Sequence, residues 1–180
     1  GYGWPRAEFA SRVAFVGSHT SYHAEWPWRQ RMVRLLSHRY GAREFRAWPE
    51  PGAEAIRGEA LRDLYASVEV VAGDSCLAGG ATRYWSDRVP ETLGRGGLLV
   101  HPRVAGIEDQ FVDGEHLVLV PPEDPEALFA ALDEVLGWPA WRRSDMRHAA
   151  LVHVLQHHTY RQRMATLLGA LPGMSGIATH

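Results

Sequence analysis

Two hydrophobic patterns alternate along this chain of 180 residues. Short, mostly apolar runs such as VAFVG at 13–17 and VEVVA at 68–72 are typical of strands buried in a parallel sheet. Between them, apolar residues recur every three or four positions, which is the period of an amphipathic helix. The runs predict five strands, at residues 13–17, 44–48, 68–72, 98–100 and 117–120.

The helical segments carry start and stop signals. Asp124 followed by Pro125 is an N-cap and first-turn pair, Gly137 ends that segment, and Thr159 caps the last one. The pattern predicts helices at residues 27–41, 59–66, 90–97, 125–137, 140–156 and 160–171. Strands that alternate with helices predict an α/β fold: a Rossmann-like, doubly wound parallel sheet with helices on both faces and a helical C-terminal end.

We expect a single Rossmann-like domain over residues 1–171 and a disordered tail at 172–180. The chain begins at Gly1 rather than at methionine, which indicates a fragment or a processed product. Ligands of doubly wound sheets bind beyond the carboxyl ends of the strands. The loops where we expect a site are therefore residues 17–23, 48–52, 74–88 and 101–109.

Composition narrows the possible chemistry. All 19 basic side chains are arginine, and lysine and asparagine are absent, a bias typical of a GC-rich genome. A phosphate site here must therefore use arginine, histidine, hydroxyl groups or backbone amides. With a formal net charge of −2, the chain lacks the overall positive charge that is typical of a nucleic-acid-binding protein. No apolar run reaches the roughly 20 residues of a membrane span, and the single cysteine favours a reducing, cytoplasmic location.

The second half of the chain carries several motifs in a fixed order. They are PETLGRGGLLV at 90–100, GIED at 106–109, VDGE at 112–115, LVLVPP at 117–122, DPE at 124–126, Arg147 with Ala149 and Ala150, and HTY at 158–160 with Arg163. In this order the chain resembles the C-terminal, donor-binding domain of a glycosyltransferase of the GT-B fold. The resemblance covers residues 13–171 and is strongest to the group-1-like branch that includes spore-maturation-type proteins.

The resemblance implies a glycosyltransferase, of hexosyltransferase type, with a nucleotide-sugar as its substrate. A UDP-sugar is favoured, and no metal or other cofactor is expected. The acceptor pocket and the main catalytic base would belong to an N-terminal half, so the catalytic residues are unknown and the isolated chain is expected to bind donor weakly without transferring it. The sugar, the base, the acceptor and the stereochemical outcome stay open.

Glu91 is the residue that would hold the ribose. Pro90 places it in a first helical turn, where the helix dipole favours a carboxylate at the carboxyl edge of the sheet. The glutamate of the resembled family accepts hydrogen bonds from both ribose hydroxyls, although a simple first-turn acid would give the same pattern. Eight positions earlier many retaining members carry another glutamate. This chain has Arg83 there, which either contacts phosphate or sugar or marks a branch that works differently.

The diphosphate would lie against Gly17 and Ser18, which match the family's glycine loop after the first strand, with the amide and hydroxyl of Thr92 on the other side. Backbone amides and hydroxyls are suitable donors to phosphate oxygens. His19 and Arg29 are nearby candidates, and an exposed surface arginine is an equal interpretation of Arg29. The lysine that many members use beside the diphosphate does not exist here.

Trp48 lies in the region where the family holds the nucleobase. An aromatic ring can stack on a base, but packing in the core is the simpler interpretation. Gly106, Ile107 and Glu108 match the loop that faces the transferred sugar. Glu108 either binds sugar hydroxyls or begins a helix.

Other functions share some of these features. A non-catalytic nucleotide-sugar-binding or assembly module would carry the same donor motifs. Gly73-Asp74-Ser75 with Asp145 and His148 resembles the two sequence blocks of GDS-type serine esterases. In those enzymes, however, the serine block normally lies at the start of the domain, and the oxyanion site uses an asparagine, which this chain lacks. His153 and His157 are four apart on a predicted helix, and zinc would need a third ligand.

Overall fold

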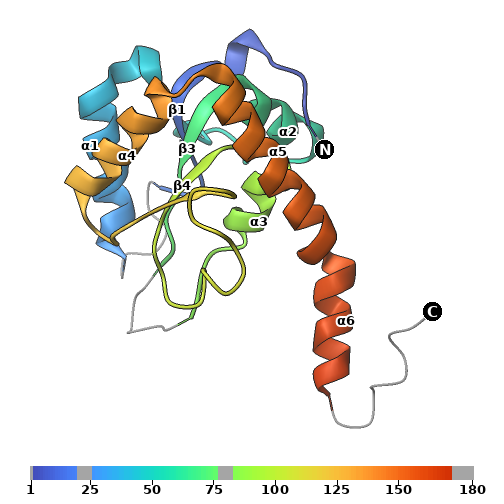
Figure 1. Ribbon diagram of the computed structural model, residues 1–180. Coiled ribbons are helices and arrows are strands. Elements are labelled where there is room, and N and C mark those ends of the chain that lie inside the picture. Colours follow the sequence, from blue (N-terminus) through green and yellow to red (C-terminus); the bar gives the residue numbers. More distant parts are fainter. Residues whose placement is uncertain (1, 20–25, 77–82, 172–180) are drawn as a thin grey trace.

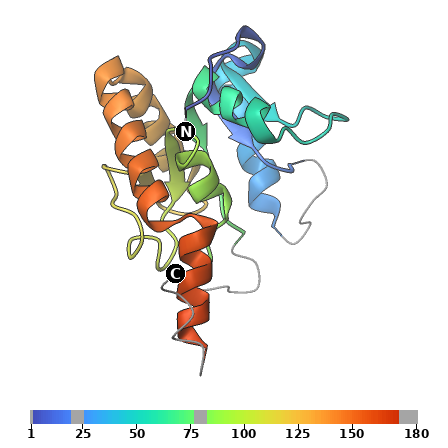
Figure 2. The same cartoon turned by 90° about the vertical axis from the view of Figure 1, so that its right-hand side faces the viewer.

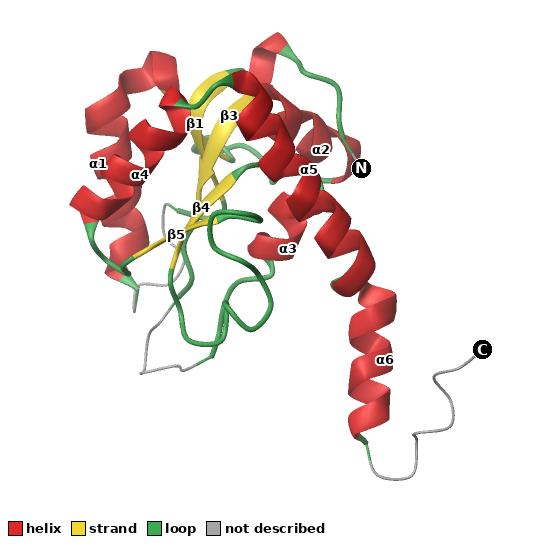
Figure 3. Ribbon diagram, viewed as in Figure 1, coloured by secondary structure: helices red, strands yellow, loops and turns green. Residues whose placement is uncertain are grey.

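The computed structural model describes residues 2–19, 26–76 and 83–171, so the predicted tail at 172–180 lies outside the described residues. Its centre is one parallel sheet, which is yellow in Figure 3. The strands are β1 (Ser11–Val16), β2 (Phe45–Trp48), β3 (Val68–Ala72), β4 (Leu99–Pro102) and β5 (Val118–Val120), in the spatial order β2-β1-β3-β4-β5. The predicted Rossmann-like, doubly wound α/β fold is confirmed.

Helices cover both faces of the sheet. They are α1 (Pro27–Glu44), α2 (Gly58–Ser67), α3 (Arg88–Leu93), α4 (Pro125–Gly137), α5 (Ala140–His157) and α6 (Tyr160–Ala170), with a short 3-10 helix at Ala7–Phe9. Helices α1 and α4 pack on one face, and α2, α3 and α5 on the other (Figure 1). The sheet thus separates two hydrophobic cores, one around Met32 and Leu132 and the other around Tyr65 and Leu93.

Local signals explain most helix ends. The Asp124 carboxylate accepts a hydrogen bond from the Ala127 amide at 3.0 Å, which caps α4 as predicted. Thr159 and Gln162 form a capping box at the start of α6. Gly41 has φ 66° and ψ 169°, so the regular helix is broken at the predicted residue and a last turn continues to Glu44.

The limits of α3 differ from the predicted range of 90–97. The helix begins two residues earlier, at Arg88, and ends at Leu93, because the amides after it fold back in tight turns: Gly97 donates to the Thr92 carbonyl at 2.9 Å. Gly96 has φ 79°, a left-handed conformation that glycine tolerates. Glu91 therefore stays in the first turn, and Thr92 moves out of it.

Helix α6 extends away from the rest of the molecule in both views (Figures 1 and 2). None of its described side chains is buried. The apolar residues whose spacing predicted the helix form a stripe that faces solvent: Tyr160, Met164, Leu167 and Leu171, which are 90%, 54%, 56% and 43% exposed. Among the described residues, no helix combines the length and the apolar composition that crossing a membrane requires.

Candidate functional site

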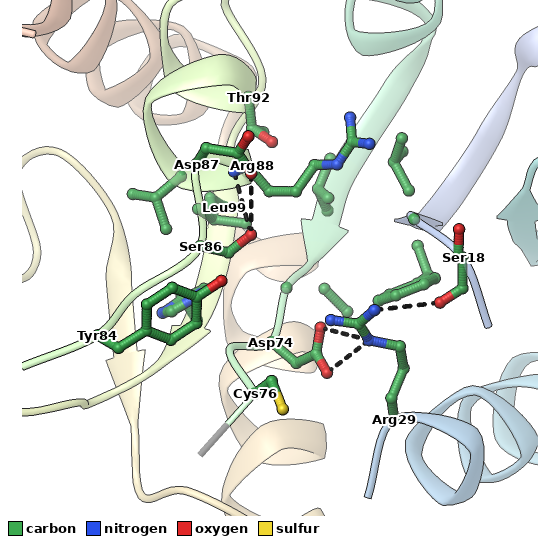
Figure 4. Close-up of a pocket in the computed structure, with 18 residues that line it drawn as sticks. Ser18, Arg29, Asp74, Cys76, Tyr84, Ser86, Asp87, Arg88, Thr92 and Leu99 are labelled. Carbon is green, nitrogen blue, oxygen red and sulfur yellow. Dashed lines mark hydrogen bonds and ion pairs between the residues drawn. The ribbon is translucent and has the colours of Figure 1, made fainter. Parts of the chain in front are cut away.

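A pocket of about 440 Å³ lies at the carboxyl edge of the sheet, over the ends of β1 and β3. The chain leaves β1 to one side to form β2 and later returns to the other side as β3, so the pocket sits where the strand order reverses. Doubly wound sheets bind their ligands at this switch point, and the volume suits a small-molecule site. Figure 4 shows the lining side chains, which come from the loops after β1 and β3, the start of α1 and the segment that enters α3.

An ion pair between Asp74 and Arg29 connects the loop after β3 to the start of α1. The buried Asp74 carboxylate accepts hydrogen bonds from Trp26 Nε1 at 3.1 Å and from Arg29 Nε at 2.9 Å. Arg29 also donates from Nη1 to the Ser18 carbonyl at 3.2 Å, as Figure 4 shows. The Arg29 side chain is only 13% exposed, so it is not the surface arginine that its sequence context allowed. Its charge is balanced by Asp74 and it fixes the loop after β1.

A buried chain of hydrogen bonds holds the segment before α3. Ser75 Oγ donates to His101 Nε2 at 3.1 Å and accepts from the Ser86 amide at 2.9 Å. His101 Nδ1 lies 2.9 Å from the Pro102 carbonyl, so Nδ1 carries the proton and Nε2 is the acceptor. Burial lowers the pKa of His101 to about 4, which keeps the ring neutral at pH 7. Ser75 therefore positions the segment that enters α3.

The residues predicted to contact the diphosphate all line the pocket, but they differ in whether their hydrogen-bond donors are already used. Gly17, Ser18 and Thr92 all line it. The Gly17 amide already donates to the Trp48 carbonyl at 2.8 Å, and Thr92 Oγ1 donates to the Tyr65 hydroxyl at 3.2 Å. In the described part of the chain, the Ser18 hydroxyl has no partner. Toward the described residues Ser18 thus keeps a free donor, and the diphosphate role of all three residues stays a prediction.

Glu91 lies beside this pocket rather than in its lining. Its carboxylate pairs with Arg88, one turn earlier, and with Arg95 Nη2 at 3.6 Å. It faces a second pocket of about 580 Å³, between α3 and the junction of α5 with α6. Arg88, in contrast, lines the first pocket. The ribose role of Glu91 stays a prediction, and it requires that the Arg88 pair opens.

The sequence of residues 4–169 matches the glycosyl transferase-like family, which is more than nine-tenths of the chain. The chain belongs to this family. No curated protein matches it in sequence. The match covers the sheet, the pocket and all but the end of α6, so the fold and the pocket described above are those of a glycosyl transferase-like domain.

Solved structures of low sequence identity share the fold. Sucrose-phosphate synthase from Thermosynechococcus elongatus has a TM-score of 0.63 at 17% identity, over 92% of this chain and 48% of that one. HepE of Anabaena, in a structure with UDP-glucose, has a TM-score of 0.64 at 14% identity, over 89% and 49%. A glycosyltransferase from Rickettsia africae has a TM-score of 0.61 at 13% identity, over 91% and 47%. This chain thus spans about half the length of these GT-B relatives.

Within this glycosyl transferase-like domain, Trp48 is a core residue. The residue is 8% exposed, and its ring meets Phe9 edge to face at 5.4 Å and has the Arg46 guanidinium 4.1 Å from its centre. These contacts fit the packing interpretation, and base stacking by Trp48 stays a prediction. His19 Nδ1 lies 3.0 Å from the Gly17 carbonyl, and His19 is not among the described residues that line the pocket.

The predicted sugar-facing loop adjoins Arg83. The Arg83 guanidinium pairs with Asp109 and lies where a side chain on Gly106 would be, 3.1 Å from an ideal Cβ. Gly106 also has φ 86°, so the positive φ and the nearby guanidinium each explain why a glycine stands there. Glu108 pairs with Arg103 on the surface, whereas Ile107 is fully buried and supports the loop from below. Arg83 and this loop are together, but contact with a sugar stays a prediction.

The esterase arrangement is not formed by the residues that the sequence indicated. Ser75 bonds to His101, not to His148. The α5 turn that carries Asp145 and His148 packs at the opposite edge of the sheet, where Arg147 donates to the Val68 and Glu69 carbonyls at the start of β3. With Ser75 fully buried, the pocket holds no exposed serine nucleophile among its described residues at this position.

Histidines gather where α5 meets α6. The His153 ring stacks on His116 with centres 4.1 Å apart, and its Nε2 lies 3.2 Å from His158 Nε2. Burial lowers the pKa of His116, and that of His158 to about 4. Across the described ranges, no three His, Cys, Asp or Glu side chains are arranged to hold a metal ion.

Sequence reasoning missed Asp74 as a pocket residue, and it also missed Arg88 and His101. The loops in which a site was expected, at residues 74–88 and 101–109, contain all three, so the rule that ligands bind beyond strand ends gave the region without singling out these side chains. Arg88 was hidden because the helix was expected to begin at Pro90. No sequence pattern distinguished it from the other arginines.

Proposed function

We propose that this chain is the donor-binding half of a glycosyltransferase that transfers a sugar from a nucleoside diphosphate sugar to an acceptor. The pocket at the switch point of the sheet carries the proposal, because it lies in a glycosyl transferase-like domain. HepE, which shares the fold, was solved with UDP-glucose, which supports a UDP-hexose as donor. In this proposal Ser18 and Thr92 face the diphosphate, Glu91 the ribose, and Gly106 to Glu108 the sugar.

In this proposal the donor-binding half contributes to transfer by stabilising the leaving diphosphate. During transfer the acceptor hydroxyl loses its proton to a base and its oxygen forms a bond to the anomeric carbon. The bond from that carbon to the diphosphate oxygen breaks, and its electron pair stays on the diphosphate. Donors aimed at that oxygen lower the barrier electrostatically, without a covalent step. No bound metal or other cofactor is part of the proposal.

A second half completes the proposed enzyme. The chain spans about half of its structural relatives, for example 48% of sucrose-phosphate synthase. The apolar stripe on α6 supports the same view, because four large side chains in water at helical spacing are typical of a surface that another domain covers. We propose that this half precedes the chain described here and supplies the acceptor pocket and the catalytic base.

The donor proposal is tested by calorimetric titration of the chain with UDP, GDP, ADP, CDP and TDP. We expect one of them, UDP first, to bind. Glu91→Ala should weaken binding roughly tenfold to a hundredfold, since hydrogen bonds to a charged group contribute about 1.5–3 kcal/mol each. Glu126→Ala is the matched control: Glu126 follows Pro125 in the first turn of α4 as Glu91 follows Pro90 in α3.

Failure of every nucleotide to bind would contradict the proposal, and equal effects of the two variants would remove Glu91 from the site. A chain that binds nucleotide but transfers no sugar after it is joined to the other half is a binding module instead.

A further inference from the structure

Positive charge at the pocket comes from few side chains. Among the described residues that line it, two are arginines, Arg29 and Arg88, and His101 is neutral at pH 7 because burial lowers its pKa to about 4. The whole chain has no lysine. Of the described residues that line the pocket, these two guanidinium groups are therefore the ones whose charge can balance a bound diphosphate, together with backbone amides and hydroxyls.

Arg29 is already committed. Both Asp74 oxygens accept from its Nε, at 2.9 and 3.1 Å, and Nη1 donates to the Ser18 carbonyl. The Asp74 charge cancels its own, and its 13% exposure leaves the side chain little room to move. Its contribution is to hold the loop that carries Ser18.

Arg88 is placed differently. It is the first residue of α3, its side chain is 42% exposed, and in Figure 4 it extends from the helix over the end of β3. Its guanidinium pairs with Glu91, the residue predicted to hold the ribose. An ion pair this exposed contributes little to stability, so a better partner for the guanidinium can replace it.

We propose that Arg88 is a diphosphate ligand that closes off Glu91 while the site is empty. When the donor enters, the guanidinium turns from the Glu91 carboxylate to the diphosphate, with which it can form two parallel hydrogen bonds. Glu91 Oε2, the oxygen that Arg88 holds in the empty site, is then free for the ribose hydroxyls, while Oε1 stays beside Arg95. This inference rests on the proposed function and assigns to Arg88 the role for which the chain has no lysine.

The exchange couples two parts of the ligand. A nucleoside without phosphates offers Arg88 no new partner, so its ribose must compete with the guanidinium for Glu91. A nucleoside diphosphate supplies the partner and frees the carboxylate at once. Arg88 should therefore favour the diphosphate and disfavour the bare nucleoside.

The test compares UDP with uridine, or the best-binding nucleoside diphosphate with its own nucleoside, on the purified chain by calorimetry. We expect Arg88→Gln to weaken UDP binding roughly tenfold or more, as for loss of a charge-assisted hydrogen bond. Uridine binding should stay the same or improve. Arg95→Gln is the matched control, because Arg95 pairs with the same carboxylate but does not line the pocket. It should leave the ratio of the two affinities unchanged.

The outcomes separate this inference from the proposed function. If UDP binds the wild-type chain and Arg88→Gln binds it equally well, the inference is overturned while the donor site stands. Equal weakening of UDP and uridine by Arg88→Gln also overturns it, since a general disturbance of α3 would act that way. If no nucleotide binds the wild-type chain, both fail. Circular dichroism checks that each variant is folded.

Discussion

Replacing Ser75 by alanine removes two hydrogen bonds at once, one buried and one partly buried. His101 Nε2 and the Ser86 amide would both lose their partner, and an unpaired buried group such as His101 Nε2 costs about 1–3 kcal/mol. We expect Ser75→Ala to lower the free energy of unfolding by roughly 2 kcal/mol or more, measured by urea denaturation. The exposed Ser144→Ala on α5 is the control and should change it by less than about 0.5 kcal/mol. Equal stability of the two variants would show that Ser75 does not form the hydrogen bonds to His101 and Ser86.

At the same scale, the sequence indicated which loops meet but not which atoms are free. Gly17, Ser18 and Thr92 reach one pocket because they follow or face the ends of β1 and β3. That Gly17 donates to Trp48, or that Thr92 donates to Tyr65, depends on side chains brought together from distant parts of the chain. No local pattern predicts such pairs.

Helix α6 differs from α4 in what its apolar face contacts. Leu132 of α4 is fully buried, so Leu132→Ala should destabilise the chain by about 2–5 kcal/mol. Leu167→Ala, the same change on the exposed stripe of α6, should alter stability by less than about 0.5 kcal/mol. Urea denaturation midpoints measure both. A large loss from Leu167→Ala would mean that α6 packs against this domain.

Element by element, the strands and the long helices were predictable because period and caps agree. The strand at Val68–Ala72 and the helix at Pro125–Gly137 match the predicted ranges. The short α3 was misplaced because Arg88 and Val89 carry no start signal, and because its end was expected at Gly96 and Gly97, whereas tight turns already begin after Leu93. Burial of α6 could not be inferred, since helical spacing does not say whether a partner is present.

The whole domain should lose stability in mild acid. Burial lowers the pKa of both His101 and His158 from 6.5 to about 4, so the unfolded chain binds more protons than the folded one between these values. Stability is then complete above pH 6.5 and falls as pH decreases, by roughly 2 kcal/mol for each histidine at pH 5. Urea denaturation from pH 8 to 5 measures the slope.

Histidine variants show which imidazole rings cause the change of stability with pH. His158→Gln should reduce the loss between pH 7 and pH 5, whereas His38→Gln, at an exposed position of α1, should leave it unchanged. A stability that does not vary over this range would contradict the neutral, buried state of these histidines.

The exposed stripe on α6 also bears on the order in which such an enzyme is made. Ribosomes deliver a chain from its amino end, and domains fold as they emerge. Under the proposed arrangement the other half would already be folded when α6 appears, so the stripe would meet its covering surface at once. Halves produced separately would instead expose it to other chains, where uncovered apolar surface promotes aggregation. Synthesis as one chain would then protect the enzyme during its own assembly.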